Sequence, residues 1–272
     1  MANRIALKVI TGLTVVLALP SALFGQVWNS PGLTAEQFKT MSPGGPAPRR
    51  DISGIWDAGA AGVNGAPQEK ELAAARAPFT PLGEQLASRN KPGNGSRSVS
   101  VAEINDPLST MGDPTGFPRI VLYELRPFQV VQTPNQVLML YMFEHRWRVI
   151  WTDGRQLPSD PDSRWYGYSV GRWEDDYTLV VETIGTDDRT WVDNSGDPHS
   201  SELHVTERYH RVNENTMELT VVIDDPMVYT KPWLGRDRLA MKRMAPGNDL
   251  AELIPAASDT QLYKDVISSQ AK

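Results

Sequence analysis

Because the sequence has no cysteine, the side chains that could carry chemistry are its four histidines, the carboxylates, and serine, tyrosine, lysine and arginine side chains. The absence of cysteine excludes thiol nucleophiles, thiolate metal ligands and disulfide bonds. A histidine beside a carboxylate is a common general acid–base pair near neutral pH. We therefore expect an acid–base site in which a histidine shuttles a proton and a carboxylate orients it. The candidate catalytic residues are His145, His199, His204, Glu207 and Asp153.

An aromatic run is the most informative part of the sequence. The alternation of residue types predicts one continuous strand over 137–152. From Met139 to Trp151, the odd positions carry large apolar side chains together with His145. This face is either a core face with a hydrogen-bonded histidine or the wall of a ligand cavity with few polar groups. The candidate substrate-binding residues are Tyr141, Phe143, Trp147 and Trp151, with Arg155 and Arg208 for an anionic group.

The predicted strand 202–212 carries a polar row on one face, which is either solvated or lines a polar pocket. A metal site of His145, His199 and His204 is an alternative, but no HxH or HExxH spacing supports it, so we expect no metal. Glu207 and His204 fall on opposite faces of a regular strand. Only a bulge would bring their side chains together.

Two further motifs have simple interpretations. Residues 167–171 match the G-x-S-x-G pattern of serine hydrolases, but a nucleophile elbow needs a strand, a sharp turn and a helix, whereas another predicted strand follows here. The two glycines fit curvature or close packing in a small barrel. Two acidic groups could bind calcium, although neither has the EF-hand spacing. They are Asp160 with Asp162, and Asp193 with Asn194 and Asp197.

The elements that must position these residues are short strands separated by turn residues, without intervening helices. Together with a first strand at 53–56 they number about eight. This pattern predicts an all-β fold, an antiparallel up-and-down barrel whose interior is filled by side chains or holds one ligand. The later strands are predicted at 122–131, 137–152, 166–173, 178–184, 202–212, 216–223 and 236–244.

The rest of the chain divides into flanking segments. Residues 1–25 combine a basic start with a short apolar run, which is typical of a cleaved secretory signal peptide with its site near Gly25. Residues 26–50 are expected to form an extended arm without regular structure. The barrel domain covers 51–244 with a loop-rich insert at 58–118, where a helix is predicted over 80–90. A tail with a short helix at 260–268 follows.

Composition limits the partners. The 272 residues are 40% hydrophobic, with 27 basic and 33 acidic side chains and a formal charge of -6. No basic stripe is present, so nucleic acid is not an expected partner. After signal removal no segment is long and apolar enough to form a spanning helix. We expect a periplasmic or secreted protein whose partner is a small molecule, with no cofactor; the oligomeric state stays open.

Several segments carry specific motifs: RDISGIW at 50–56, RPF at 126–128, QTP at 132–134, WTDGR at 151–155, GYSVGRW at 167–173, PHS with LHVTER at 198–208, and DDP with YTKPW at 224–233. Over about residues 50–235 the chain thereby resembles an uncharacterised family of exported bacterial proteins. The resemblance brings no established activity. It implies that the family pattern includes His199, His204, Glu207 and Asp153-Gly154-Arg155 but not His210.

The triplet Gly54-Ile55-Trp56 matches the G-x-W of a first barrel strand. Through this motif the chain is similar to lipocalin-like, or calycin, barrels. The long insert between Trp56 and the second strand differs from the usual lipocalin strand arrangement. The resemblance implies a calycin-type barrel rather than a particular ligand.

Two classes of function fit these expectations. The first is an exported enzyme, a lyase, isomerase or cofactor-free hydrolase, acting on an apolar or aromatic substrate in a barrel cavity. The alternative is a lipocalin-like periplasmic carrier that binds an apolar ligand without catalysis. They differ in the polar groups that the cavity must contain. An enzyme needs a histidine and a carboxylate within hydrogen-bond reach of each other in one cavity, whereas a carrier needs only apolar walls.

The basic start and short apolar run of the chain generate a first prediction. Cell fractionation followed by mass spectrometry should find a protein that begins near Gln26 outside the cytoplasm. Recovery of the full-length chain from the cytosol would refute export.

Overall fold

The computed structural model describes residues 27–64, 76–254, 258, 261–262 and 265–266. The predicted signal peptide at 1–25 lies outside the described residues, as does much of the helix expected at 260–268. No helix in the described ranges is long and apolar enough to cross a membrane.

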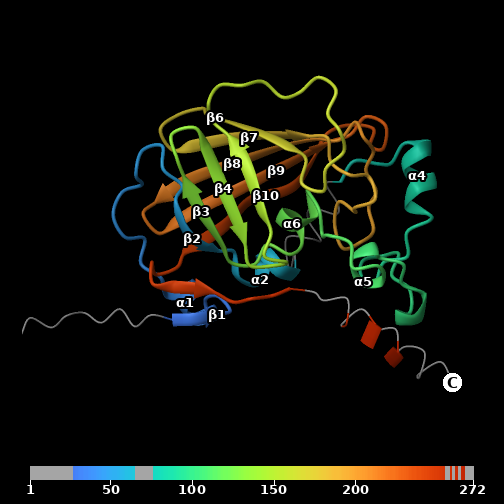
Figure 1. Ribbon diagram of the computed structural model, residues 1–272, viewed down its shortest axis with the longest axis horizontal. Coiled ribbons are helices and arrows are strands. Elements are labelled where there is room, and N and C mark those ends of the chain that lie inside the picture. The colour runs from blue at the N-terminus through green and yellow to red at the C-terminus, as the bar shows by residue number, and fades with distance from the viewer. Residues whose placement is uncertain (1–26, 65–75, 255–257, 259–260, 263–264, 267–272) are drawn as a thin grey trace, which may run out of the picture.

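Nine strands form one closed barrel (Figure 1). Each strand pairs with the next along the chain, and β10 closes the barrel by pairing with β2. This confirms the expected all-β barrel, with nine strands in place of about eight. The strands are β2 (Gly54–Asp57), β3 (Phe128–Gln132), β4 (Gln136–Tyr141), β5 (Trp147–Trp151), β6 (Tyr168–Trp173), β7 (Thr178–Ile184), β8 (His204–Asn213), β9 (Thr216–Asp224) and β10 (Trp233–Arg243).

The expected purely antiparallel order is wrong at one place, because β5 and β6 pair in parallel. The paired positions are Ile150 with Ser169 and Trp151 with Val170, at the end of β5. A hairpin turn can only reverse the chain, whereas the long connection 152–167 carries it back so that β6 starts in the same direction. This connection is the yellow-green loop above the barrel in Figure 1.

The expected single strand over 137–152 is also wrong, because a tight turn divides it into β4 and β5. Glu144 and His145 both have a left-handed backbone, with φ of 60° and 48°. Leu140 then pairs with Trp147, so the chain reverses on itself. The turn changes which positions face inward: Arg148 is buried, whereas Trp147 is 64% exposed. The proposed aromatic wall therefore does not exist as one face, and His145 is exposed in the turn.

Inward side chains of the strands form the core, among them Trp56, Phe128 and Leu219. The indole Nε1 of Trp56 donates a hydrogen bond to the Ile52 carbonyl oxygen at 2.9 Å. Helix α6 (Arg119–Leu122) belongs to the same core, because all four of its residues are buried. The predicted strand 122–131 is therefore wrong at its start, because Leu122 ends this helix and β3 begins at Phe128.

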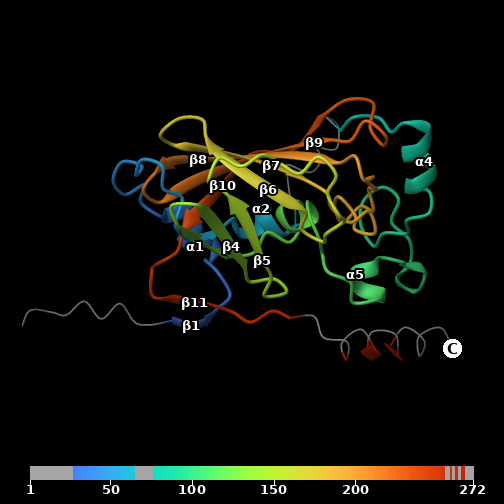
Figure 2. The ribbon, with the colours of Figure 1, turned by 45° about the horizontal axis from the view of Figure 1, so that its top comes forward.

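The flanking segments contain more structure than expected. Strand β1 (Val27–Ser30) pairs in parallel with β11 (Asn248–Leu250), and this small sheet lies beside the barrel (Figure 2). The segment expected as an unstructured arm thus contains both β1 and a helix. The helices outside the barrel wall are α1 (Ala35–Thr40), α2 (Gly59–Asn64), α4 (Pro81–Ala87), the 3-10 helix η1 (Val101–Glu103) and α5 (Pro107–Thr110). Helix α4, capped by Thr80, confirms the prediction at 80–90.

Candidate functional site

A buried polar network lies inside the barrel around Arg148 of β5. The guanidinium donates to both carboxylate oxygens of Glu207 on β8, at 3.0 and 2.5 Å. It also donates to the hydroxyl oxygens of Ser169 on β6 at 2.9 Å and Thr183 on β7 at 2.6 Å. One side chain thereby connects four strands of the barrel, including both sides of the parallel β5–β6 pair.

Aromatic side chains enclose this network. The ring of Phe117 lies 4.1 Å from the guanidinium carbon of Arg148. The Tyr209 hydroxyl donates to Glu207 at 2.7 Å. Burial raises the pKa of the Tyr141 hydroxyl to about 12. Burial acts to lower the pKa of Arg148, but the Glu207 carboxylate outweighs it and raises that pKa above its usual value. The pair is charged, buried and satisfied by hydrogen bonds.

A pocket of about 510 Å³ opens where β5 and β6 separate, and we call it the seam pocket. Its walls come from β5, from β6 and from the connection 152–167, and Arg148 and Ser169 of the buried network are among its lining residues. Gly167 begins the β6 wall with φ of 62°, and a Cβ there would lie 2.6 Å from the Ile184 carbonyl oxygen. This glycine is therefore required by the backbone path rather than by a catalytic elbow.

Rings and guanidiniums are stacked around the seam pocket. The guanidinium carbon of Arg155 lies 3.6 Å from the ring centre of Trp151, and that of Arg164 lies 3.9 Å from the ring centre of Tyr168. Arg155 is neutralised by Asp153, at 2.7 Å. Arg164 is exposed and forms no ion pair with any described residue. The pocket thus combines ring faces with an uncompensated positive charge.

A second buried carboxylate fixes one wall of this pocket. The Tyr166 hydroxyl donates to Glu144 at 2.9 Å. Glu144 also accepts from the backbone nitrogen of Thr115 at 2.7 Å and from its hydroxyl at 2.9 Å. Burial, assisted by Glu144, raises the pKa of Tyr166. Because its proton is held by Glu144, Tyr166 offers the pocket a ring rather than an acid.

The structure brings together some of the expected binding residues and not others. Trp147, Trp151 and Arg155 all line the seam pocket, with Asp153 attached to Arg155. Phe143 and Tyr141 are buried and do not line it. Arg208 lies on the outer face of β8, where it donates to Glu174 at 2.9 Å.

The expected catalytic residues are dispersed. His204 and Glu207 lie on opposite faces of β8, since the pairing of β8 with β9 is regular from His204 to Arg211. His199 is buried, with Nε2 2.8 Å from the Thr190 hydroxyl and Nδ1 3.1 Å from the Ser200 carbonyl oxygen. Burial lowers the pKa of His199 and so favours its neutral form.

No three histidine, aspartate or glutamate side chains in the described ranges lie close enough to share a metal ion. His145, His199 and His204 are accordingly not brought together. Of the acidic groups considered for calcium, Asp193 and Asp197 are paired with Arg76, the former at 2.6 Å. Those carboxylates are already neutralised by a guanidinium.

Sequence reasoning missed Arg148, Arg164, Tyr166 and Tyr168. Arg148 was missed because the run 137–152 was interpreted as one strand, in which Arg148 falls on the face opposite the aromatic positions. The polar residues Glu144 to Arg146, in the middle of that run, were the available signal for a turn. Tyr166 and Tyr168 flank a glycine, and nothing local to them indicates a pocket.

Comparison of the chain with protein-family models, curated proteins and solved structures returned no match. The resemblance to a family of exported proteins therefore stays a prediction, and the site is interpreted from its own geometry.

The buried pair generates a stability prediction. Arg148→Met should lower the free energy of unfolding by about 3 to 5 kcal/mol, because it leaves the Glu207 carboxylate buried without its partner. The double variant Arg148→Met/Glu207→Leu should regain most of that loss, because no uncompensated charge remains. Urea unfolding at pH 7 measures both.

The matched control is the exposed pair of Arg172 and Glu182, which lie 2.7 Å apart. Its double variant Arg172→Met/Glu182→Leu should change stability by less than about 1 kcal/mol. An Arg148→Met protein as stable as the wild type would contradict the description of the buried pair.

Proposed function

We propose that this protein binds a flat, apolar small molecule that carries a negative charge, and that the seam pocket is the binding site. The observation that carries the proposal is the combination of four aromatic side chains with the unpaired guanidinium of Arg164 around a space of about 510 Å³. A volume of this size fits a small organic ligand. The aromatic residues are Trp147, Trp151, Tyr166 and Tyr168.

The physical basis is the match between ring faces and a planar ligand. Trp147 is 64% exposed, so a ligand that covers its face removes apolar surface from water. The stacked guanidiniums of Arg155 and Arg164 extend the flat surface beyond the rings. Arg164 would pair with the ligand's anionic group at the edge of the pocket.

Binding receives more support than catalysis. None of the four histidines, all within the described ranges, lines the seam pocket. Glu207 is held by Arg148 and Tyr209, so its oxygens are engaged by donors. A general base needs a free acceptor within reach of the reacting proton. The carrier hypothesis therefore fits the geometry better than the acid–base enzyme, and it requires no cofactor.

The expected signal peptide gives this proposal its cellular setting. An exported protein with a pocket open to solvent would carry or sense its ligand outside the cytoplasm. The proposal for the ligand does not depend on that setting, because it rests on the pocket alone.

The binding proposal is tested with the anionic dye 1-anilinonaphthalene-8-sulfonate, followed by fluorescence and calorimetry. We expect saturable binding to the folded protein. Trp147→Ala should weaken it about 2- to 12-fold, the effect of about 0.5 to 1.5 kcal/mol from one aromatic contact. Arg164→Gln should weaken binding and reduce its dependence on salt, because the lost contact is an ion pair.

Two control variants match these changes in residue type and exposure. Trp28 is 72% exposed on β1, and Arg172 is exposed on β6, and neither lines the seam pocket. Trp28→Ala and Arg172→Gln should leave the affinity unchanged. An equal loss of dye affinity in the test and control variants, or unchanged affinity in Trp147→Ala, would refute the seam pocket as the site.

A further inference from the structure

A second pocket, of about 640 Å³, lies between the insert that follows β2 and the loop that precedes β8. We call it the arginine pocket. Its walls come from residues 76–97, from residues 193–197 and from the beginning of β10, and it shares no lining residue with the seam pocket. The ligand proposed for the seam pocket therefore leaves the arginine pocket unexplained.

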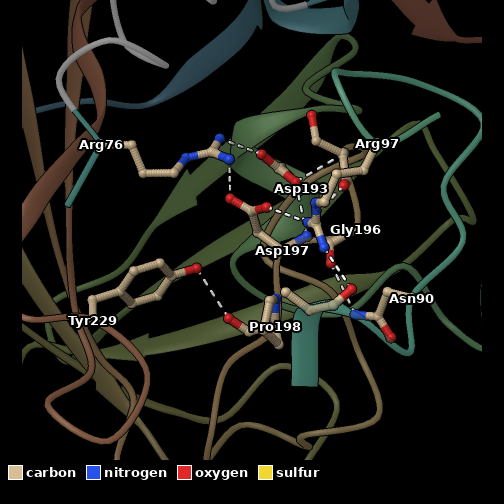
Figure 3. Close-up of polar contacts among 10 residues, drawn as sticks. Arg76, Asn90, Arg97, Asp193, Gly196, Asp197, Pro198 and Tyr229 are labelled. Carbon is tan, nitrogen blue, oxygen red and sulfur yellow. Dashed lines mark hydrogen bonds and ion pairs between the residues drawn. The ribbon is translucent and has the colours of Figure 1, made fainter. Parts of the chain in front are cut away.

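Two guanidiniums, those of Arg76 and Arg97, reach the same pair of carboxylates from different sides in this pocket (Figure 3). Arg76 contacts Asp193 at 2.6 Å and also contacts Asp197. Arg97 contacts the other oxygen of Asp197 at 2.7 Å. Because one carboxylate is shared, the two guanidiniums converge on it from separate parts of the insert.

Backbone contacts fix this arrangement. Arg97 donates to the Ala87 carbonyl oxygen at 2.6 Å and to the Ser195 carbonyl oxygen at 3.0 Å. The Asn90 side chain donates to the Gly196 carbonyl oxygen at 2.9 Å. These bonds attach the insert to the loop 193–197, so the guanidiniums are positioned before any ligand arrives. Such preorganisation reduces the ordering cost of binding.

Within this cluster of ion pairs the guanidiniums are more exposed than the carboxylates. The side chains of Asp193 and Asp197 are 12% and 2% exposed, whereas those of Arg76 and Arg97 are 24% and 30% exposed. A guanidinium carries five N–H donors, and each of these arginines uses only part of its set in the contacts above. The carboxylates are thus more enclosed than the guanidiniums, which retain N–H donors not used in these contacts.

Aromatic rings lie beside both cations. The guanidinium carbon of Arg76 is 4.9 Å from the ring centre of Trp233, and that of Arg97 is 5.8 Å from the ring centre of Phe79. Rings exclude water on one side of each cation, and Coulomb interactions are stronger where water is excluded. A ligand oxygen would therefore interact more strongly here than with an arginine on an open surface.

Three acidic side chains line the pocket, and the one that is not paired with an arginine opposes an anion. Glu84 of α4 is exposed, lines the pocket and forms no ion pair with the described residues. Its charge limits the affinity for an anion without occupying the donors of Arg76 or Arg97. This opposition provides a sensitive test, because neutralising Glu84 should strengthen anion binding.

We propose that the arginine pocket is a second binding site, which takes a compact ligand bearing an oxyanion, a phosphate or carboxylate group. The oxyanion accepts charge-assisted hydrogen bonds from N–H donors of Arg76 and Arg97 that Asp193 and Asp197 leave unused. This site is independent of the ligand proposed for the seam pocket.

The test is a titration of the full mature chain with phenyl phosphate, followed by the indole N–H signals in ¹H–¹⁵N NMR spectra. Trp233→Phe assigns the signal of Trp233, which stacks on Arg76. We expect a saturable shift of this signal, reversed by competition with inorganic phosphate. Trp147 and Trp151 report separately on the seam pocket, so failure of one site does not decide the other.

Variants sharpen the outcome. Arg97→Gln should weaken phenyl phosphate binding about tenfold, and Glu84→Gln should strengthen it about two- to threefold through the removed repulsion. Arg172→Gln, far from the pocket lining, should change nothing. If Arg97→Gln does not fold, Glu84→Gln decides the question.

Three results would overturn the proposal. They are the absence of a saturable Trp233 shift, an equal shift with neutral benzyl alcohol, and unchanged affinity in Glu84→Gln.

Discussion

The interaction on which the rest of the structure depends is the set of bonds that Arg148 makes inside the barrel. Its guanidinium joins β5 to Ser169, Thr183 and Glu207 on the next three strands. A buried charge is tolerated only when it is paired and hydrogen-bonded, so every member of this network constrains the others. The network holds the two sides of the β5–β6 seam together where backbone pairing between them is short.

That constraint shapes the candidate site. Backbone pairing joins β5 and β6 at the end of β5. Nearer the start of β5, the Arg148 side chain joins the two strands through its hydrogen bond to Ser169. Between these attachments and the connection 152–167 a pocket remains, with Trp147 and Trp151 on one side and Tyr168 on the other. The inner side of the seam is polar and closed, whereas the outer side is aromatic and open. Binding on the outer side is consistent with an interior occupied by side chains.

The sequence predicted the barrel well because period-two alternation is a local property of each strand. Strand β7 was predicted with its observed bounds, and the separation of His204 from Glu207 followed from alternation alone. The turn at Glu144 and His145 was missed because its local sign was only a short polar stretch, without the glycine or proline that usually marks a turn. Without this turn, the alternation places Arg148 and Trp147 on the wrong faces of the strand: Arg148 is buried, and Trp147 is exposed. The parallel pair and the pocket depend on long-range packing of 152–167, which no local pattern encodes.

The central claim, that Arg148 holds β5 and β6 together at their short parallel seam, is tested most directly by amide hydrogen exchange of the Arg148→Met/Glu207→Leu protein. A Leu219→Ala protein, altered on β9, serves as the comparison. The account predicts that exchange rises at least tenfold in β5 and β6 of the double variant, while β8 and β9 stay protected. Exchange that rises uniformly over the barrel, or stays unchanged at the seam, would contradict it.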